Sequence, residues 1–599
     1  MTAAHEQIVG RVKQAMRTGE YLRAYDWALI GLEDMPDESE LQYLAVLALA
    51  RTGATDQAQS RYKEFGLSDI DNIDYAALEA RLVKDKALVS HPRKKPSRFT
   101  SAAKLYEAVF ARTEEKEFYP AINAATTYYL AGDHTKADSL ARTVLSLCQQ
   151  TEPNYWRYAS EAEAHLLMGN IDLAVKALES SNEYSDGNLA AMGATKKQLA
   201  LICNDPAILD TLKIPRVAHF AGHIISTDST TGRFPASLES EVAGKIEKLV
   251  DQLDVGIGYG SLAAGADILF AEAILRRGGE LHITLPFNLE EFKRVSVGCS
   301  GERWLTRFDA CWEQASSHSF SSEGNYRGDN TLFNYCSLYS MGRACLKQQH
   351  LAASLSQLLV WDEETASTVA GTYSDYKIWT DLGYESHIVS LARNTGLSNQ
   401  HSPATSASDE PAENAKQLHA ILFGDIRGFS SLSDAKLPKF VKEIMGCLAT
   451  VLDNINAEYH GDAVLMANTW GDGLFIVLRN VEIAAQCAIH MQQALKKLEL
   501  NDEELQEKAE LRLGIHFGPI YEIKDPVTKR ENFFGEHVNR AARIEPITPP
   551  GQVYVTESFA AQLALTHGAD YKTEYVGYMP MAKNYGDLPM YLLREAFDD

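Results

Sequence analysis

The segment at residues 396–416 most constrains how this chain can fold. It reads GLSNQHSPATSASDEPAENAK, which is small, polar and proline-bearing, with too few apolar side chains to build a core. We interpret 396–416 as a flexible linker that isolates a separate domain at residues 417–599. The chain has 599 residues, and a single hydrophobic core rarely serves more than about 300. Two to four domains are therefore expected.

Residues 1–205 have the pattern of successive helices with a weak internal repeat. A glycine recurs with an alanine five residues after it, and the first interval between glycines is 34 residues. Glycine permits a tight turn between helices, and alanine lets the next helix pack closely. The segment resembles a degenerate tetratricopeptide solenoid, which implies a peptide or protein partner on its concave face; a plain helical bundle is the alternative. The pairs are Gly19 with Ala24, Gly53 with Ala58, Gly132 with Ala137 and Gly169 with Ala174.

The hydrophobic period changes at about residue 215, where strand-like and helical runs begin to alternate up to residue 395. This alternation predicts an α/β domain with a parallel sheet. The loop GYGSLAAGAD at residues 258–267 lies where such a sheet places a ligand, with helix amides available to an anion. The domain resembles the SLOG group of Rossmann-like domains, which implies a nucleotide-like ligand. A purely structural domain is the alternative.

Charge and composition exclude several classes of partner. The net charge of −24 argues against general affinity for nucleic acid or anionic lipid, since both need a basic face. The apolar runs fall short of the roughly 20 residues of a membrane-spanning helix, and MTAAHEQIVGRVKQ lacks a secretory pattern. The eight cysteines form no CxxC pair, which favours buried reduced thiols. We predict a cytoplasmic protein that binds neither nucleic acid nor membrane.

The stretch FGDIRGFSSLSD at residues 423–434 carries the first candidate site. A buried strand ends at Asp425, and Gly428 lets the chain bend into a helix predicted to begin near Ser430. A carboxylate at this position can hold a metal ion. The exposed amides of Gly428, Phe429 and Ser430 can face a polyphosphate.

A second carboxylate strengthens this interpretation. Strand-like runs flank GDG at residues 471–473, which predicts a tight hairpin with Asp472 at its tip. If the hairpin lies beside the first strand, Asp472 and Asp425 converge. Paired carboxylates suit Mg²⁺ or Mn²⁺, and two such ions can grip both the attacking and the leaving oxygen of a phosphoryl transfer.

The third candidate element is FFGEHVNRAARIEP at residues 533–546. A helix after the glycine would present Asn539 and Arg543 on one face, at i and i+4. Arginine is a permanently charged donor for phosphate oxygens, and asparagine can bond a ribose. An ordinary polar helix surface is the alternative.

These elements in this order resemble the class III nucleotidyl cyclases, the adenylate and guanylate cyclase family. The resemblance covers about 415–596 through LFGDIRGFSSLSD, NTWGDGLFIVL, RLGIHFGPI and FFGEHVNRAARI. It implies an α+β domain with a ferredoxin-like β-α-β-β-α-β core, acting as a homodimer with each active site at the interface. It assigns two metal ions to the site of Asp425, Ile426 and Asp472. Asn539 and Arg543 would stabilise the transition state.

The resemblance also implies the reaction. The ribose 3′-oxygen attacks the α-phosphorus, pyrophosphate leaves and a 3′,5′-cyclic nucleotide forms. Lys583 would hold the terminal phosphates, although Asn584 stands beside it where the family usually has glycine. Diguanylate cyclases share the fold, but WGDGLF lacks the second acidic residue of their hairpin motif.

Base choice is open. The two positions that read the base in the family are occupied here by Asn468 and Asn532, and an asparagine amide can both donate and accept. We favour ATP because it is the commonest substrate of the family. GTP, or a pyrimidine nucleotide as in bacterial antiphage relatives that make cyclic CMP or cyclic UMP, is the alternative. A catalytically inactive scaffold is the alternative of another class. If the domain is an active cyclase, we expect the N-terminal domains to regulate it.

Overall fold

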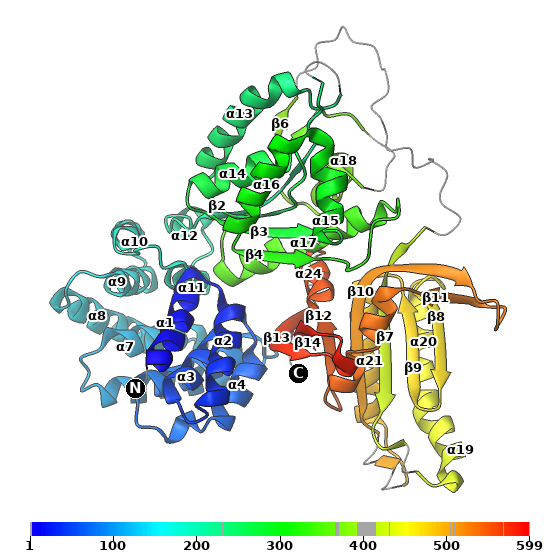
Figure 1. Cartoon of the computed structure of the whole chain (residues 1–599). Coiled ribbons are helices and arrows are strands. Elements are labelled where there is room, and N and C mark those ends of the chain that lie inside the picture. Colours follow the sequence, from blue (N-terminus) through cyan, green and yellow to red (C-terminus); the bar gives the residue numbers. More distant parts are fainter. Residues whose placement is uncertain are drawn as a thin grey trace.

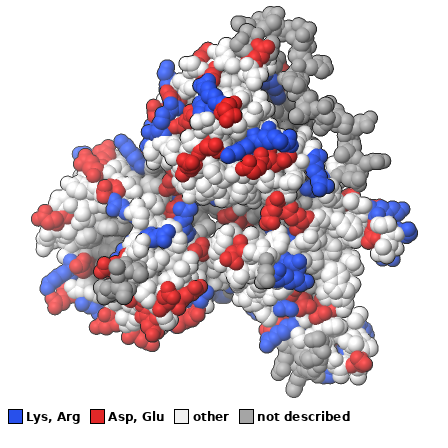
Figure 2. Space-filling view, viewed as in Figure 1, with Lys and Arg blue, Asp and Glu red and all other residues white. Residues whose placement is uncertain are grey.

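The computed structural model describes residues 3–228, 232–365, 370–391, 415–429, 432–502, 505–506, 509–566, 568 and 570–597. Most of the expected linker, residues 396–414, lies outside the described residues. Figure 1 shows three bodies in contact: a helical N-terminal domain, a middle domain and a C-terminal domain. Figure 2 shows acidic and basic side chains interspersed over the viewed face, without one broad basic surface. In the described part of the chain, no helix is both long and apolar enough to cross a bilayer.

The N-terminal domain is all helical, and neighbouring helices pack in sequence order. The glycines of the repeat all adopt left-handed backbone conformations, with φ of 78° at Gly19, 87° at Gly53, 90° at Gly132 and 76° at Gly169. The alanine five residues after each is at most 2% exposed. The helices are α1 Ala3–Thr18, α2 Tyr21–Asp34, α3 Ser39–Thr52, α4 Thr55–Glu64, α5 Ile73–Leu88, α6 Lys95–Arg112, α7 Phe118–Ala131, α8 His134–Gln150, α9 Tyr155–Leu167, α10 Ile171–Glu183, α11 Leu189–Leu199 and α12 Pro206–Leu209.

The middle domain is a parallel six-stranded sheet in the order β4-β3-β2-β1-β5-β6. Helices α13, α14 and α16 cover one face, while α17 and α18 pack on the other. The strands are β1 Arg216–Gly222, β2 Val255–Gly260, β3 Glu280–Leu285, β4 Ser317–Phe320, β5 Leu355–Trp361 and β6 Ser386–Ser390. The helices are α13 Glu239–Gln252, α14 Ala266–Arg276, α15 Leu289–Phe292, α16 Glu302–Gln314, α17 Thr331–Leu351 and α18 Thr372–Asp381.

The C-terminal domain is built on a mixed sheet in the order β13-β14-β12-β10-β7-β9-β8, with β11 paired to β10. Helices α20, α21 and α24 pack on one face and α23 on the other. Its first part has the expected β-α-β-β-α-β order. The strands are β7 Gln417–Ile426, β8 Val464–Trp470, β9 Gly473–Leu478, β10 Leu511–Lys524, β11 Glu531–Phe534, β12 Val553–Thr556, β13 Tyr571–Pro580 and β14 Asp587–Glu595. The helices are α19 Leu437–Phe440, α20 Gly446–Glu458, α21 Val481–Lys497, α23 Glu536–Ala541 and α24 Glu557–Leu565.

Helix α17 joins the three domains. It packs on α24 of the C-terminal domain and on α11 of the helical domain. Tyr335 in α17 donates a hydrogen bond of 2.8 Å to the carbonyl of Phe517. On the other side of the C-terminal domain, Tyr575 in β13 donates to Asp26 in α2 at 2.8 Å. The C-terminal domain is therefore docked on both neighbouring domains.

Candidate functional site

The carboxyl groups of Asp425 and Asp472 lie at one end of the C-terminal sheet. Strands β7 and β9 are antiparallel with Gly424 opposite Leu474, so the end of β7 meets the start of β9. Asp472 occupies the two-residue turn that is closed by the pair Trp470 and Gly473. The structure brings the two side chains within hydrogen-bonding reach of each other.

The pKa of Asp472 is raised by its surroundings in the fold. Burial, together with the hydrogen bond and negative charge of Asp425, raises the pKa of Asp472 to about 6. Arg512, opposite Asp425 on β10, offsets part of this charge by donating from Nε at 3.1 Å and Nη2 at 2.5 Å to Asp425 Oδ2. Glu545 adds a third carboxylate, 2.5 Å from Arg512 Nε. Among the described residues, three carboxylates thus lie around the guanidinium group of Arg512.

This donor set fits a divalent cation. Carboxylate oxygens are the hard ligands that Mg²⁺ and Mn²⁺ prefer, and a cation would relieve the repulsion that raises the pKa of Asp472. The side chain of Ile426, also predicted here, is 1% exposed, so only its main chain can face such an ion. Sequence reasoning missed Arg512 and Glu545. A charged residue inside the buried run LRLGIHF was the signal available for Arg512.

The expected start of a helix near Ser430 falls outside the described residues and stays a prediction. The first described helical residues after Ser430 begin at Asp434. Gly428 has a left-handed φ of 76°. The Phe429 ring packs against Phe440 with centroids 4.9 Å apart, and it also lies beside the hairpin turn at Gly471.

The helix that was expected to carry both Asn539 and Arg543 is shorter than predicted. Helix α23 ends at Ala541, so Arg543 follows it in a tighter turn, where its amide bonds the carbonyl of Arg540. Asn539 is exposed on α23. Arg543 Nε is buried without a hydrogen-bond partner among the described residues. The contacts described for Asp425 come instead from Arg512.

The remaining predicted residues lie at the sheet surface. Asn468 is exposed on β8, and Asn532 is partly buried on β11, where its Nδ2 donates to Asp525 at 3.3 Å. They flank one apolar cluster that contains Phe475, Met466 and Phe533. Lys583 is exposed in the turn between β13 and β14, with a left-handed φ of 60°. Neither Asn468 nor Lys583 has a described contact with the acidic pair.

Helix α23 is held by the middle domain. His537 shares a hydrogen bond of 3.0 Å with the hydroxyl of Ser322 through its Nε2 atom, and one of 2.7 Å with His516 Nε2 through its Nδ1 atom. Burial lowers the pKa of both histidines well below the ordinary value, so this pair is neutral at physiological pH. Arg540 bonds Glu323 at 3.2 Å. The position of α23 thus depends on the loop after β4.

The C-terminal edge of the middle sheet is a second candidate site. The strand order changes direction between β1 and β5, the place where open α/β sheets hold ligands. His223 and Asp362 meet there at 3.0 Å, and Asp375 is 4% exposed nearby on α18. Asp267, at the end of the glycine-rich loop 258–267, accepts a hydrogen bond of 3.1 Å from the amide of Ala263 in the same loop. This carboxylate therefore stabilises the loop conformation. A nucleotide-like ligand at this edge stays a prediction.

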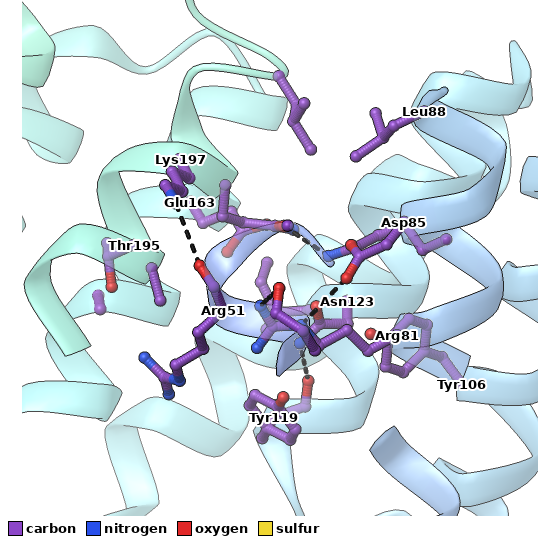
Figure 3. Close-up of a pocket in the computed structure, with 18 of the residues that line it drawn as sticks. Arg51, Arg81, Asp85, Leu88, Tyr106, Tyr119, Asn123, Glu163, Thr195 and Lys197 are labelled. Atoms are coloured by element: carbon purple, nitrogen blue, oxygen red, sulfur yellow. Dashed lines mark hydrogen bonds and ion pairs between the residues drawn. The ribbon is translucent and has the colours of Figure 1, made fainter. Parts of the chain in front are cut away.

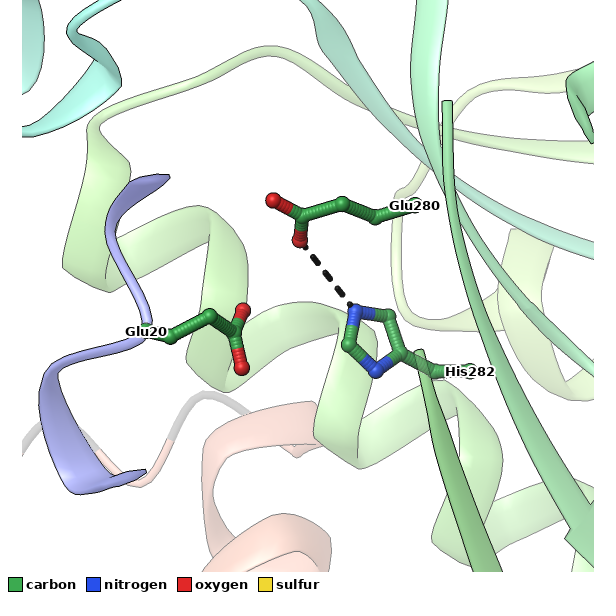
Figure 4. Close-up of side chains that lie close together, drawn as sticks. All are labelled: Glu20, Glu280 and His282. Carbon is green, nitrogen blue, oxygen red and sulfur yellow. Dashed lines mark hydrogen bonds and ion pairs between the residues drawn. The ribbon is translucent and has the colours of Figure 1, made fainter. Parts of the chain in front are cut away.

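A cluster of potential metal ligands also lies between the helical and middle domains. Within the described ranges, Glu20, Glu280 and His282 bring their ligand atoms within 4.8 Å of one another (Figure 4). However, the ammonium group of Lys347 occupies this cluster, contacting Glu20 directly and Glu280 at 3.1 Å. The cluster is therefore a buried ion-pair network, with lysine in the place of a metal.

Two family models match the chain. Residues 412–595 match the adenylate and guanylate cyclase catalytic domain, and residues 22–128 match the tetratricopeptide repeats-sensor domain. An adenylate cyclase of Anabaena cylindrica is 32% identical over 162 residues, covering 24% of this chain and 30% of that protein. Guanylate cyclase 32E of Drosophila melanogaster is 28% identical over 147 residues, covering 23% of this chain and 12% of that protein. The chain spans less than a third of the length of these relatives.

Solved structures of cyclase domains are also among the proteins to which this chain is similar. The guanylate cyclase domain of RhGC from Catenaria anguillulae, in complex with GTP, is 19% identical with a TM-score of 0.26, covering 31% of this chain and 99% of that one. The adenylyl cyclase CyaB from P. aeruginosa is 18% identical with a TM-score of 0.25, covering 31% of this chain and 96% of that one.

Proposed function

We propose, on the premise that residues 412–595 form a class III adenylate and guanylate cyclase catalytic domain, that the chain is a nucleotidyl cyclase. It converts a nucleoside triphosphate, with ATP favoured, to a 3′,5′-cyclic nucleotide and pyrophosphate. One observation carries this proposal: the side chains of Asp425 and Asp472 lie together at one end of the sheet. Burial and the neighbouring carboxylate raise the pKa of Asp472 to about 6.

Asp425 and Asp472, with the main chain of Ile426, would hold two Mg²⁺ or Mn²⁺ ions. When bound, such ions lower the pKa of the ribose hydroxyl and neutralise charge on the phosphates. The chain itself contributes orientation and charge. Arg512 fixes the rotamer of Asp425 through its paired hydrogen bonds, and Arg543 supplies a permanent cation to developing phosphate charge.

A homodimer would complete the site. Asn539 and Lys583 are exposed, and neither side chain has a hydrogen-bond or ion-pair partner among the described residues of one chain. Large aromatic side chains of the same domain are also exposed, with Trp470 at 56%, Tyr578 at 58% and Phe534 at 40%. Exposed aromatic groups are enriched in protein interfaces. A second chain that covers them would bring its own polar residues to the acidic pair.

Regulation of the cyclase would act through the contacts of its domain with the middle and helical domains. The middle domain holds α23 through Ser322 and Glu323, and the helical domain holds β13 through Asp26. A change in either N-terminal domain can therefore shift residues near Asn539 or Lys583. The cytoplasmic location stays a prediction.

The test is direct. The full-length protein is incubated with each of ATP, GTP, CTP and UTP plus Mn²⁺, and cyclic products are identified by mass spectrometry. Asp425→Asn and Arg543→Ala should each lower turnover by about 10²-fold or more, because transition-state contacts are lost. Asp453→Asn, at an exposed carboxylate of α20, is the matched control. Unchanged turnover in either site variant, or no cyclic product from any nucleotide, would refute the proposal.

A further inference from the structure

The helical domain contains a cavity that the proposed reaction does not use. It has a volume of about 350 Å³, is partly open to solvent and is lined by helices of the N-terminal domain, with residues from α3, α5, α6, α7, α9 and α11 (Figure 3). That volume is at the lower end of the range for small-molecule sites. One lining residue, Lys572, comes from β13 of the cyclase domain.

The lining is rich in cations, although the chain as a whole is strongly acidic. Two acids, Asp85 and Glu163, face five basic side chains. Asp85 pairs with Arg81 at 3.3 Å, while Glu163 accepts hydrogen bonds from the neutral Thr126 and Gln198. The cations are Arg51, Arg81, Lys84, Lys197 and Lys572.

Most of these cations bond neutral groups. Lys84 donates to the amide oxygen of Gln198 at 2.7 Å, Arg51 to the carbonyl of Ala190 at 2.5 Å, and Lys197 to the carbonyl of Arg51 at 3.4 Å. Burial and the nearby charges of Arg81 and Arg51 lower the pKa of Lys197 to about 8. Lys572 is paired with Glu574 at 3.0 Å. Arg51, Lys84 and Lys197 bond only neutral groups among the described residues, so an anion would stabilise the charge that they bring to the cavity.

Buried polar and aromatic groups also face the cavity. The hydroxyl of Tyr106 is buried, and the residue is 0% exposed, yet this oxygen has no hydrogen-bond partner among the described residues. A buried hydroxyl without a partner is costly, so a ligand atom is its natural complement. Two aromatic side chains of the lining remain open to solvent, Tyr119 at 40% and Trp156 at 39%. Such faces suit a planar group.

We propose that this cavity binds a small anion that carries a planar group, with the chemistry of a nucleoside monophosphate. Its phosphate would lie among Arg51, Arg81 and Lys197, within reach of Tyr106, and its base against Trp156.

Lys572 couples this site to the cyclase. It lies near the start of β13, and Lys583 follows the end of the same strand. A bound anion that contacts Lys572 would therefore act on the hairpin that presents Lys583. This coupling rests on the proposed cyclase activity, whereas binding does not.

The binding experiment uses full-length protein carrying Asp425→Asn, so that the cyclase site is impaired. AMP, GMP, CMP, UMP and inorganic phosphate are each titrated by calorimetry. We expect saturable binding of at least one monophosphate, weakened at least tenfold by Lys197→Gln and several-fold by Tyr106→Phe. Lys104→Gln, at an exposed lysine of α6, is the matched control and should bind normally. Tyr106→Phe removes only a hydroxyl that has no partner among the described residues, so this variant should fold like the wild-type protein.

The results separate the two proposals. Absence of binding by all five probes, or unchanged affinity in both Lys197→Gln and Tyr106→Phe, would overturn the cavity proposal whatever the cyclase does. For the coupling, the monophosphate that binds is added to the wild-type cyclase assay. It should change turnover at least twofold, and Lys572→Ala should abolish that change. An effect that persists in Lys572→Ala would refute the coupling.

Discussion

Replacing Lys347 with methionine tests the ion-pair network between the helical and middle domains. The side chain of Lys347 is 6% exposed, and it contacts Glu20 and Glu280, which are 20% and 22% exposed. Lys347→Met keeps most of the side-chain volume but leaves two partly buried carboxylates facing each other. Removing one partner of a buried ion pair typically costs about 3–5 kcal/mol.

The pH dependence follows from the shifted groups. Burial raises the pKa of Glu20, but the charge of Lys347 outweighs it and holds the pKa well below its usual 4.5. Burial lowers the pKa of Lys347, but both glutamates outweigh it and hold the pKa above its usual 10.5. The pair therefore stabilises the fold fully between about pH 4.5 and 10.5. The contribution declines as the pH falls from 4.5 towards the folded pKa of Glu20, or rises from 10.5 towards that of Lys347.

The deficit of Lys347→Met should also shrink as the pH falls from 7 to 5. Without the lysine, the crowded carboxylates gain protons more readily, and His282 can become charged beside them. Urea unfolding measures the free energy, and hydrogen exchange around Glu20 reports the contact itself. Lys248→Met, at an exposed lysine of α13, is the control and should change stability by less than about 0.5 kcal/mol. Equal stability of the two variants at pH 7 would refute the reasoning.

Other contacts between domains give further predictions. Burial raises the pKa of Asp26 to about 6 despite the hydrogen bond from Tyr575, so ionisation of Asp26 destabilises the fold as the pH rises from about 4 to 6. Asp26→Asn should therefore raise the Tm at pH 8 and make the Tm less dependent on pH. A lower Tm at pH 8 would contradict this reasoning. A Cβ at Gly342 would lie 2.2 Å from the carbonyl oxygen of Ala561, so Gly342→Ala should separate α17 from α24 and cost about 1–3 kcal/mol in unfolding experiments. Gly244→Ala meets nothing within 4 Å and should be neutral or stabilising by up to about 1 kcal/mol; equal behaviour of the two would count against the close packing.

Local patterns were enough to predict the elements of this fold. The four repeat glycines could be recognised because a left-handed turn between helices favours glycine, and each is followed five residues later by an alanine. The hairpin at Asp472 could be recognised because GDG separates two strand-like runs, and the parallel sheet because strands and helices alternate.

The features that were not predicted depend on tertiary contacts. Arg512 neutralises Asp425 through a cross-strand register that no local pattern specifies. Helix α23 was expected to continue through Arg543, but it ends at Ala541, before Pro546, as the chain turns back across β10. The contact between Asp26 and Tyr575 joins residues 549 positions apart. Such pairings follow from the assembled fold alone.

The docking of α17 on α24 bears on how the protein can be dissected. Leu565 at the end of α24 is fully buried in a cluster with Met341 of α17 and Trp379 of α18. A fragment that begins in the linker would expose this apolar patch to water, where it favours aggregation. Low activity of such a fragment could then reflect insolubility and would say little about regulation. Binding and turnover are best measured on the intact polypeptide.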